Sequence, residues 1–132
     1  MFDTKNLKVL ILEDEYVQAL YLRECLEELG IQQINVITNA EKADALLQQK
    51  RPDIAFLDIR MKDQDLGIEI ASLCKGVGVE HVVFTSSFTD EDTLQRAMSV
   101  ASDGFLLKPY DASNVKVQVF LCLARSGSTD EC

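Results

Sequence analysis

The chain has 132 residues, of which 47% are hydrophobic and 27% are charged, and its formal net charge is −9. This length suits one domain with a large buried core, and no apolar run is long enough to span a bilayer. The acidic excess argues against direct binding of nucleic acid, which depends on Lys and Arg side chains that neutralise phosphates. The first residues lack a basic segment followed by an apolar one, so we expect no signal peptide and a cytoplasmic protein.

The cysteines are far apart in the sequence and form no Cys-x-x-Cys pair: Cys25, Cys74, Cys122 and Cys132. We interpret them as reduced thiols. A thiolate metal site needs clustered Cys or His residues, and His81 is the only histidine of the chain. The sequence therefore gives such a site little support.

The N-terminal part of the chain shows a strand pattern, a helix pattern and a second strand pattern. Residues 7–12 form a nearly continuous apolar run that stops at the acidic residues 13–15, which predicts a buried strand with carboxylates at its end. Residues 19–29 carry apolar side chains at helical spacing, and Gly30 ends the predicted helix. A short strand is expected over residues 34–37.

A second helix precedes the most apolar strand of the chain. Residues 38–39 offer an N-cap, residues 40–47 place apolar side chains on one face, and Pro52 disfavours helical geometry at the residue before it. Residues 54–57 are all apolar and are followed by Asp58. This run predicts a central strand of a parallel sheet, covered on both faces.

The alternation continues through the next forty residues. A polar loop over residues 61–66 leads to a helix over 67–74, which the following glycines end, and a strand is predicted over 82–85. Residues 89–92 resemble a capping box, with Asp in the last position where Glu or Gln is usual. They precede a helix whose apolar residues recur over 94–101.

The C-terminal segment allows two interpretations. After a fifth strand over residues 104–107, residues 115–119 alternate as in a sixth strand and are rich in β-branched side chains. We favour a helix over residues 113–124, because its apolar positions fit one face and the preceding pattern is strictly strand and helix. We expect residues 1–125 to form the domain and residues 126–132 to be a disordered polar tail.

Five strands that alternate with five helices predict an α/β fold, a flavodoxin-like doubly wound parallel sheet with strand order 2-1-3-4-5. The carboxyl ends of parallel strands meet at one edge of the sheet, where such folds place their reactive groups. That edge would gather two acids, a third acid, a hydroxyl and an ammonium: Glu13, Asp14, Asp58, Thr85 and Lys108. Each residue alone has an ordinary structural explanation, but the set together predicts a site.

Three carboxylates at one edge need a cation or a shifted pKa, because two of them about 4 Å apart repel by roughly 4 kcal/mol at an effective dielectric constant of 20. Oxygen ligands from carboxylates favour Mg²⁺. With a metal ion on one side and the Lys108 ammonium on the other, Asp58 is placed to attack phosphorus and form an aspartyl phosphate. The hydroxyl of Thr85 and the ammonium would bind the new oxygens.

Four stretches of the chain carry a family resemblance, and they occur in that family's order and spacing. They are residues 9–15, residues 57–61 with 67–71, residues 84–86 and residues 104–110. Over residues 9 to about 124, the chain resembles a response-regulator receiver domain of two-component signalling, similar to the chemotaxis regulators.

The resemblance implies a metal site and a phosphoacceptor. Asp58 would accept the phosphoryl group, and Asp14 would bind Mg²⁺ directly, with Asp58 as a further ligand. Glu13 would assist through water, and the backbone carbonyl of Arg60 would be the remaining protein ligand.

The resemblance also implies a switch. Thr85 would hydrogen-bond the phosphoryl oxygens and move toward them on activation, Lys108 would pair with the phosphate, and Phe105 would be the aromatic side chain that swings inward behind Thr85. In this family a bond such as Lys108–Pro109 is commonly cis, which proline permits at low cost.

The chain departs from the family pattern in one loop. Lys62 stands where Pro is usual, and the loop from Asp58 to Gly67 is one residue longer than is usual in the family. Arg60 and Ser87 occupy the two variable positions that, in this family, tune dephosphorylation. We hypothesise that Arg60 covers the phosphoryl group and slows attack by water.

The predicted function is a phosphorylation-dependent signalling switch. A sensor histidine kinase or a histidine phosphotransfer protein would phosphorylate Asp58, and the surface of the predicted helix at 94–101, the strand at 104–107 and the last helix would change shape. Three apolar residues that lie off the core face of that last helix would either complete the core or form a homodimer or target interface: Val117, Phe120 and Leu121. We expect no enzymatic activity beyond the domain's own phosphoryl acceptance and slow autodephosphorylation.

Two alternative functions are compatible with an α/β sheet. Enzymes of the haloacid dehalogenase type also form an aspartyl phosphate, but they need an Asp-x-Asp arrangement after the first strand, whereas residues 58–60 read Asp-Ile-Arg after the third. The other is a phosphate-insensitive adaptor that keeps only the fold. The complete set of acids, Thr and Lys argues against that adaptor.

Overall fold

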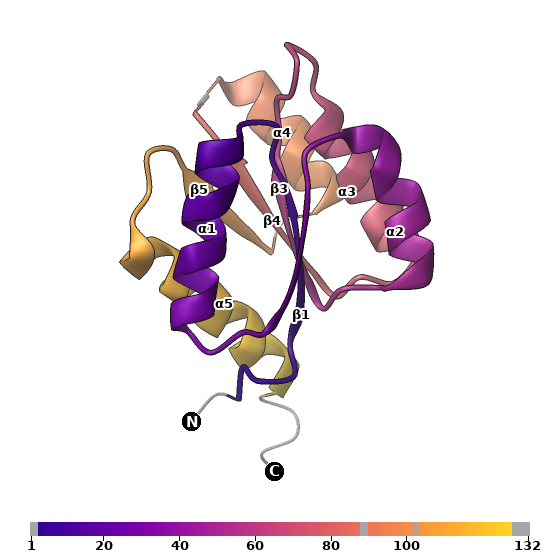
Figure 1. Cartoon of the computed structure of the whole chain (residues 1–132). Helices are drawn as coiled ribbons and strands as arrows, with labels where there is room; N and C mark the ends of the chain where they lie inside the picture. The colour runs from indigo at the N-terminus through magenta and orange to yellow at the C-terminus, as the bar shows by residue number, and fades with distance from the viewer. Residues whose placement is uncertain (1–2, 88–89, 102, 128–132) are drawn as a thin grey trace.

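The computed structural model describes residues 3–87, 90–101 and 103–127, and it confirms the predicted α/β architecture. A five-stranded parallel sheet with strand order β2-β1-β3-β4-β5 lies between two layers of helices. Helices α1 and α5 cover one face, and α2, α3 and α4 cover the other (Figure 1). The elements are β1 (Lys8–Leu12), α1 (Tyr16–Glu28), β2 (Gln33–Ile37), the 3₁₀ turn η1 (Ala40–Lys42), α2 (Ala43–Gln49), β3 (Ile54–Asp58), α3 (Leu66–Gly76), β4 (His81–Ser86), α4 (Glu91–Val100), β5 (Gly104–Leu107) and α5 (Ala112–Gly127).

The central strands are buried on both faces, as their continuous apolar runs predict. All five residues of β3 are buried. Successive side chains point to opposite faces of a strand, so Leu10 and Leu57 pack with α2, α3 and α4, whereas Ile11 and Phe56 pack with α1 and α5. Two hydrophobic cores therefore clamp the sheet and fix the positions of its strand ends.

The last segment is a helix, and the alternative of a sixth strand is wrong. Val115, Val119 and Cys122 are fully buried at helical spacing in α5. The helix runs to Gly127, beyond the predicted end near residue 124, so the first residues assigned to the tail are helical. The Ser126 hydroxyl donates to the carbonyl of Cys122 at 3.2 Å, which accommodates a polar residue in the last turn. Residues 128–132 lie outside the described part of the chain.

Two helix starts were predicted from their caps. The side chain of Asn39 accepts a hydrogen bond from the backbone N–H of Glu41, but the segment it caps is η1, which then leads into α2. At α4 the N-cap is Asp90, whose carboxylate accepts from the N–H of Thr93 at 2.9 Å. Thr89, the first residue of the predicted capping box, lies outside the described residues.

Within the described residues, no helix is both long enough and apolar enough to cross a membrane.

Candidate active site

Three carboxylates converge at the carboxyl edge of the sheet. Asp58 is the last residue of β3, and Glu13 and Asp14 follow the neighbouring strand β1. Each of the three offers an oxygen that lies within 4.8 Å of the oxygens of the other two. The sheet register brings together acids that are 44 or more residues apart in the sequence, as predicted from the strand ends.

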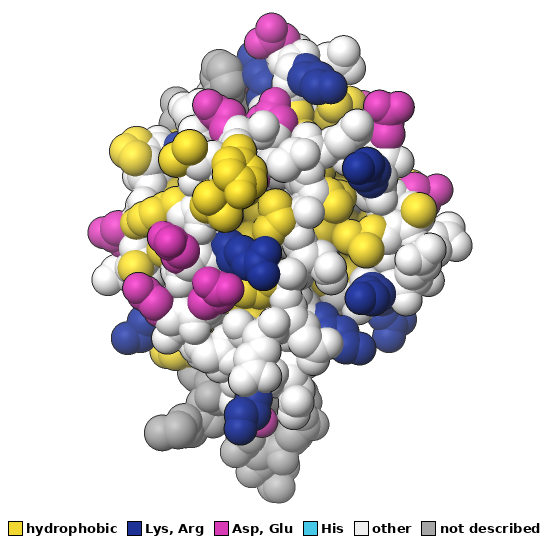
Figure 2. All heavy atoms as spheres, in the orientation of Figure 1, with side chains coloured by type: hydrophobic (Ala, Val, Ile, Leu, Met, Phe, Trp, Pro, Cys, Tyr) yellow, Lys and Arg dark blue, Asp and Glu magenta, His cyan; other side chains and the backbone are white. Residues whose placement is uncertain are grey.

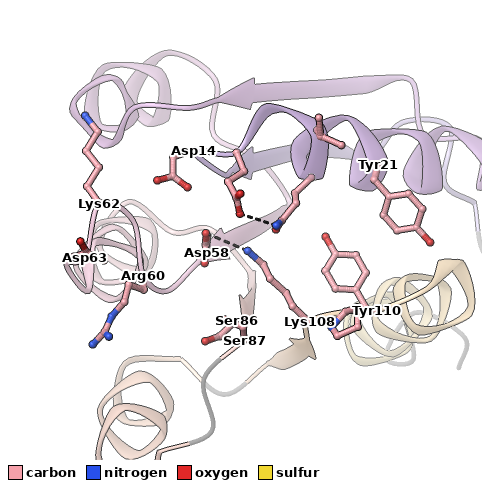
Figure 3. A pocket seen from close by; sticks show the side chains of 14 residues that line it. Asp14, Tyr21, Asp58, Arg60, Lys62, Asp63, Ser86, Ser87, Lys108 and Tyr110 are labelled. Atoms are coloured by element: carbon pink, nitrogen blue, oxygen red, sulfur yellow. Dashed lines mark hydrogen bonds and ion pairs between the residues drawn. The ribbon is translucent and has the colours of Figure 1, made fainter.

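Lys108 brings a positive charge into contact with two of these acids. Its Nζ donates to Glu13 Oε1 at 2.8 Å. It also donates to Asp58 Oδ2 at 3.2 Å (Figure 3). The side chain is only 14% exposed, because it extends from the end of β5 across the edge of the sheet. The backbone N–H of Lys108 donates to the carbonyl of Ser86 at 2.8 Å, and the Lys108–Pro109 bond is cis, as expected.

The charge balance favours a cation. The pKa of Asp58 is raised to about 7, mainly by burial and also by the nearby carboxylate of Glu13, while Lys108 opposes the shift. Burial lowers the pKa of Lys108, but its contacts with Glu13 and Asp58 outweigh that effect and leave the pKa raised. One ammonium cannot neutralise three ionised carboxylates, so a divalent ion with oxygen ligands fits this set of side chains.

Thr85 and Phe105 lie on the two strands beyond β3. Thr85 is the register partner of Asp58 on β4 and is buried. Phe105 is the register partner of Phe84 on β5, is half-buried and packs against the core under α2, α3 and α4. Thr85 is therefore next to Asp58, whereas Phe105 lies one strand further along the sheet and is not fully buried.

The loop after β3 explains why the chain departs from the family pattern there. Met61 and Gln64 exchange two backbone hydrogen bonds of 2.9 Å, and Lys62 and Asp63 between them have φ angles of 52° and 60°. These values describe a two-residue hairpin turn with both central residues left-handed. Proline is fixed near φ −65° and cannot adopt such an angle. The same turn therefore accounts both for Lys62 in place of proline and for the extra residue of the loop.

Gly67 is required where the loop enters α3. A Cβ atom on Gly67 would lie 2.0 Å from the backbone oxygen of Asp58, a distance that no side chain tolerates. The N–H of Gly67 donates to the carbonyl of Ile59 at 2.9 Å. The start of α3 is therefore packed directly on the backbone of the candidate phosphoacceptor.

Comparison with known proteins decides the family. The family model of the response regulator receiver domain matches residues 9–120 of this chain. The chain belongs to this family. The receiver domain is 28% identical over 118 residues to the transcriptional regulatory protein PdtaR of Mycobacterium tuberculosis, covering 89% of this chain and 57% of that protein.

Two further relatives differ in how much of them the chain covers. It is 28% identical over 109 residues to the chemotaxis protein CheY of Halobacterium salinarum, covering 82% of this chain and 89% of that one. The signal receiver domain of a modulated diguanylate cyclase from Desulfovibrio desulfuricans superposes with a TM-score of 0.81 at 33% identity, covering 93% of this chain and 98% of that one. The receiver domain spans about half the length of the first curated relatives that it matches.

A pocket of about 880 Å³ lies above the acids of the receiver domain. Asp14, Asp58 and Lys108 are among its charged lining residues, and Tyr21 and Tyr110 form part of an apolar wall, with ring centroids 6.1 Å apart. Burial raises the pKa of the Tyr110 hydroxyl well above its usual range, so this group stays neutral. The apolar wall was not predicted from the sequence, although Tyr110 directly follows the Lys-Pro motif.

Proposed function

We propose that the receiver domain is a phosphorylation-controlled switch in which Asp58 accepts a phosphoryl group in a reaction that needs Mg²⁺. The observation that carries this proposal is the position of Asp58, between the acids that follow β1 and the Nζ of Lys108. Membership in the family supports phosphorylation-dependent signalling in general. The donor, the metal and the roles of the individual residues are our proposals.

The side chains of Asp14 and Asp58 and the backbone carbonyl of Arg60 would hold the ion, with Glu13 acting through a water molecule. When bound, Mg²⁺ would neutralise the carboxylates and the oxygens of the incoming phosphoryl group. The remaining chemistry belongs to the protein's own side chains. A carboxylate oxygen of Asp58 forms the new bond to phosphorus, and the bond from phosphorus to the donor nitrogen breaks. The donor imidazole keeps that electron pair.

Lys108 and Thr85 would stabilise the transferred group. Lys108 already lies 3.2 Å from Asp58 Oδ2, so its ammonium can pair with a phosphoryl oxygen after little movement. Thr85 is the register partner of Asp58, and its hydroxyl would move to hydrogen-bond another phosphoryl oxygen. Phe105 would fill the space behind Thr85. Slow hydrolysis would restore the free carboxylate, and we propose no other enzymatic activity.

The donor would be a histidine kinase or a histidine phosphotransfer protein that approaches over α1. The pocket above Asp58 is lined on one side by Val17, which is 77% exposed, and Tyr16 beside it is 67% exposed. Hydrophobic side chains gather on the surface over α1 (Figure 2). Exposed apolar patches beside a site favour binding of a protein partner. A donor protein whose imidazole reaches Asp58 through this pocket would contact the apolar side chains of α1.

The output surface would be formed by α4, β5 and α5. Met98, Leu107, Val117 and Leu121 are exposed there, whereas Phe120 is half-buried and packs against the core under α1 and α5. One of the three candidate interface residues thus joins the core. We propose that the others form a homodimer interface after phosphorylation, which light scattering over a dilution series, with and without beryllofluoride, would test. No change in mass with the mimic would contradict the dimer.

Intact mass spectrometry tests the central proposal. The protein is incubated with acetyl phosphate and Mg²⁺, beside an Asp58→Asn variant and a sample with EDTA. We expect one phosphoryl group on the parent protein alone, and only with the metal. A parent protein that gains no phosphoryl group would favour the adaptor that keeps the fold without the chemistry.

A further inference from the structure

Asp65 occupies the N-cap position of α3, yet its carboxylate does not cap the helix. An Asp at this position usually accepts a hydrogen bond from the first free N–H groups of its helix. Here Oδ1 accepts from Arg60 Nε at 3.3 Å, and Oδ2 accepts from Arg96 Nη2 of α4. The hydrogen bond from Arg96, with a further one from Arg60, holds the pKa of Asp65 below its usual value. The Asp65 carboxylate thus binds two guanidinium groups instead of the N-terminus of its own helix.

Arg60 lies between two negatively charged sites. It follows Asp58 by two residues and lines the pocket above it, but its guanidinium points away from Asp58 in Figure 3. Its ion pair with Asp65 is partly exposed, with 37% of the Arg60 side chain and 20% of the Asp65 side chain accessible. Such a pair is weak enough to be broken by a stronger acceptor nearby.

A phosphoryl group on Asp58 is that stronger acceptor, because it adds up to about two negative charges and three acceptor oxygens. From the ion pairs of Arg60 and Arg96 we infer that Asp65 is a positioning residue, which holds Arg60 away from the phosphoryl site and so sets the lifetime of the phosphorylated state. This inference rests on the proposed function of Asp58. In hydrolysis, water forms a bond to phosphorus, the bond from phosphorus to the Asp58 oxygen breaks, and a proton goes to solvent. A guanidinium over the phosphoryl group hinders the approach of that water.

The same carboxylate connects the site with α4. Arg96 pairs with Asp65 and, at 3.6 Å, with Asp92 of its own helix. When Arg60 moves to the phosphoryl group, Asp65 retains Arg96 as its remaining arginine. The loop after β3 and helix α4 therefore share one acidic residue whose partners depend on the state of Asp58.

The test compares phosphoryl lifetimes in four proteins: the parent, Asp65→Asn, Arg60→Ala and the double variant. Release of inorganic phosphate is followed after excess acetyl phosphate is removed. We expect Asp65→Asn to slow hydrolysis by roughly two- to five-fold, the ratio that an exposed ion pair supplies. In the Arg60→Ala background the same substitution should change nothing. Asp92→Asn is the matched control, because it removes a carboxylate from Arg96 without touching Arg60, and it should leave the lifetime unchanged.

The inference is overturned if Asp65→Asn leaves the lifetime unchanged, or if its effect persists without the Arg60 side chain. The latter result would assign Asp65 a purely structural role. Failure of the proposed function looks different, because the parent protein would then gain no phosphoryl mass. Exchange of the Arg60 Nε proton, measured by NMR in the unphosphorylated protein, decides the pairing in either case. We expect this proton to be protected in the parent and to lose protection in Asp65→Asn, and equal exchange would refute the inference.

Discussion

Replacing Asp58 by Asn should stabilise the metal-free protein, and the gain should depend on pH. Asn resembles the protonated carboxyl group, so the substitution removes the cost of ionising a buried acid. The pKa of Asp58 is raised from 3.8 to about 7 in the folded protein. The native state therefore binds more protons than the unfolded state between these two values, and the stability of the parent falls as the pH rises through this window.

The size of the effect follows from the same two values. Each pH unit of difference corresponds to about 1.4 kcal/mol, so the difference of about three pH units gives an upper limit of about 4 kcal/mol. The advantage of Asp58→Asn should be below about 1 kcal/mol near pH 4, should grow toward pH 7 and should then stay constant. Most of it should appear in EDTA, because a bound divalent ion would stabilise the ionised carboxylate of the parent.

Urea unfolding of both proteins at several pH values measures this difference directly. The slope of stability against denaturant should be the same for both, which keeps the comparison free of changes in the unfolded state. A difference that does not vary between about pH 4 and about pH 7 would refute the argument, because it would mean that Asp58 is not the group that takes up the proton. Addition of Mg²⁺ should narrow the gap at high pH by stabilising the parent alone.

Three further predictions concern the loop and the donor surface. In urea unfolding, Gly67→Ala should destabilise the fold by about 2 kcal/mol or more, because its Cβ would overlap the backbone of Asp58. The control Gly76→Ala, whose Cβ meets nothing within 4 Å, should be neutral or mildly stabilising in the same assay. Lys62→Pro should lower the thermal midpoint, whereas Lys62→Gly should not, because only glycine accepts a positive φ without strain; equal midpoints would contradict the hairpin. Val17→Asp should slow phosphorylation by a protein donor at least several-fold but leave the rate with acetyl phosphate unchanged, and loss of both rates would mean that Val17 supports the site itself.

The strand ends made most of the site predictable. Glu13, Asp58 and Lys108 each end an apolar run, and a parallel sheet brings the carboxyl ends of its strands to one edge whatever the loops do. The two cores follow from alternation along those same runs. These inferences need only the period of the apolar residues and the order of the strands.

The remaining features depend on contacts that no local pattern encodes. The Asp65–Arg96 pair spans 31 residues and exists because α3 packs beside α4. The hairpin at Lys62 and Asp63 lacks the Asn-Gly or Asp-Gly pair by which such turns are usually predicted. The end of α5 was placed too early for a related reason, since the polar side chain of Ser126 is in hydrogen-bond contact with the ring of His81, 45 residues away in the sequence.

The loop after β3 is where this receiver domain acquires its own properties. The acids and Lys108 are held by strands packed between two cores, so their geometry leaves little room for variation. The hairpin at Lys62 instead changes what lies above Asp58, and three residues later the chain reaches Asp65, whose carboxylate turns from its own helix to two arginines. If Asp58 accepts a phosphoryl group as we propose, a substitution in this loop should alter the phosphoryl lifetime and the link to α4 without altering phosphoryl acceptance. We accordingly expect variants of Asp65 to separate these two properties, and variants of Lys108 to lose both.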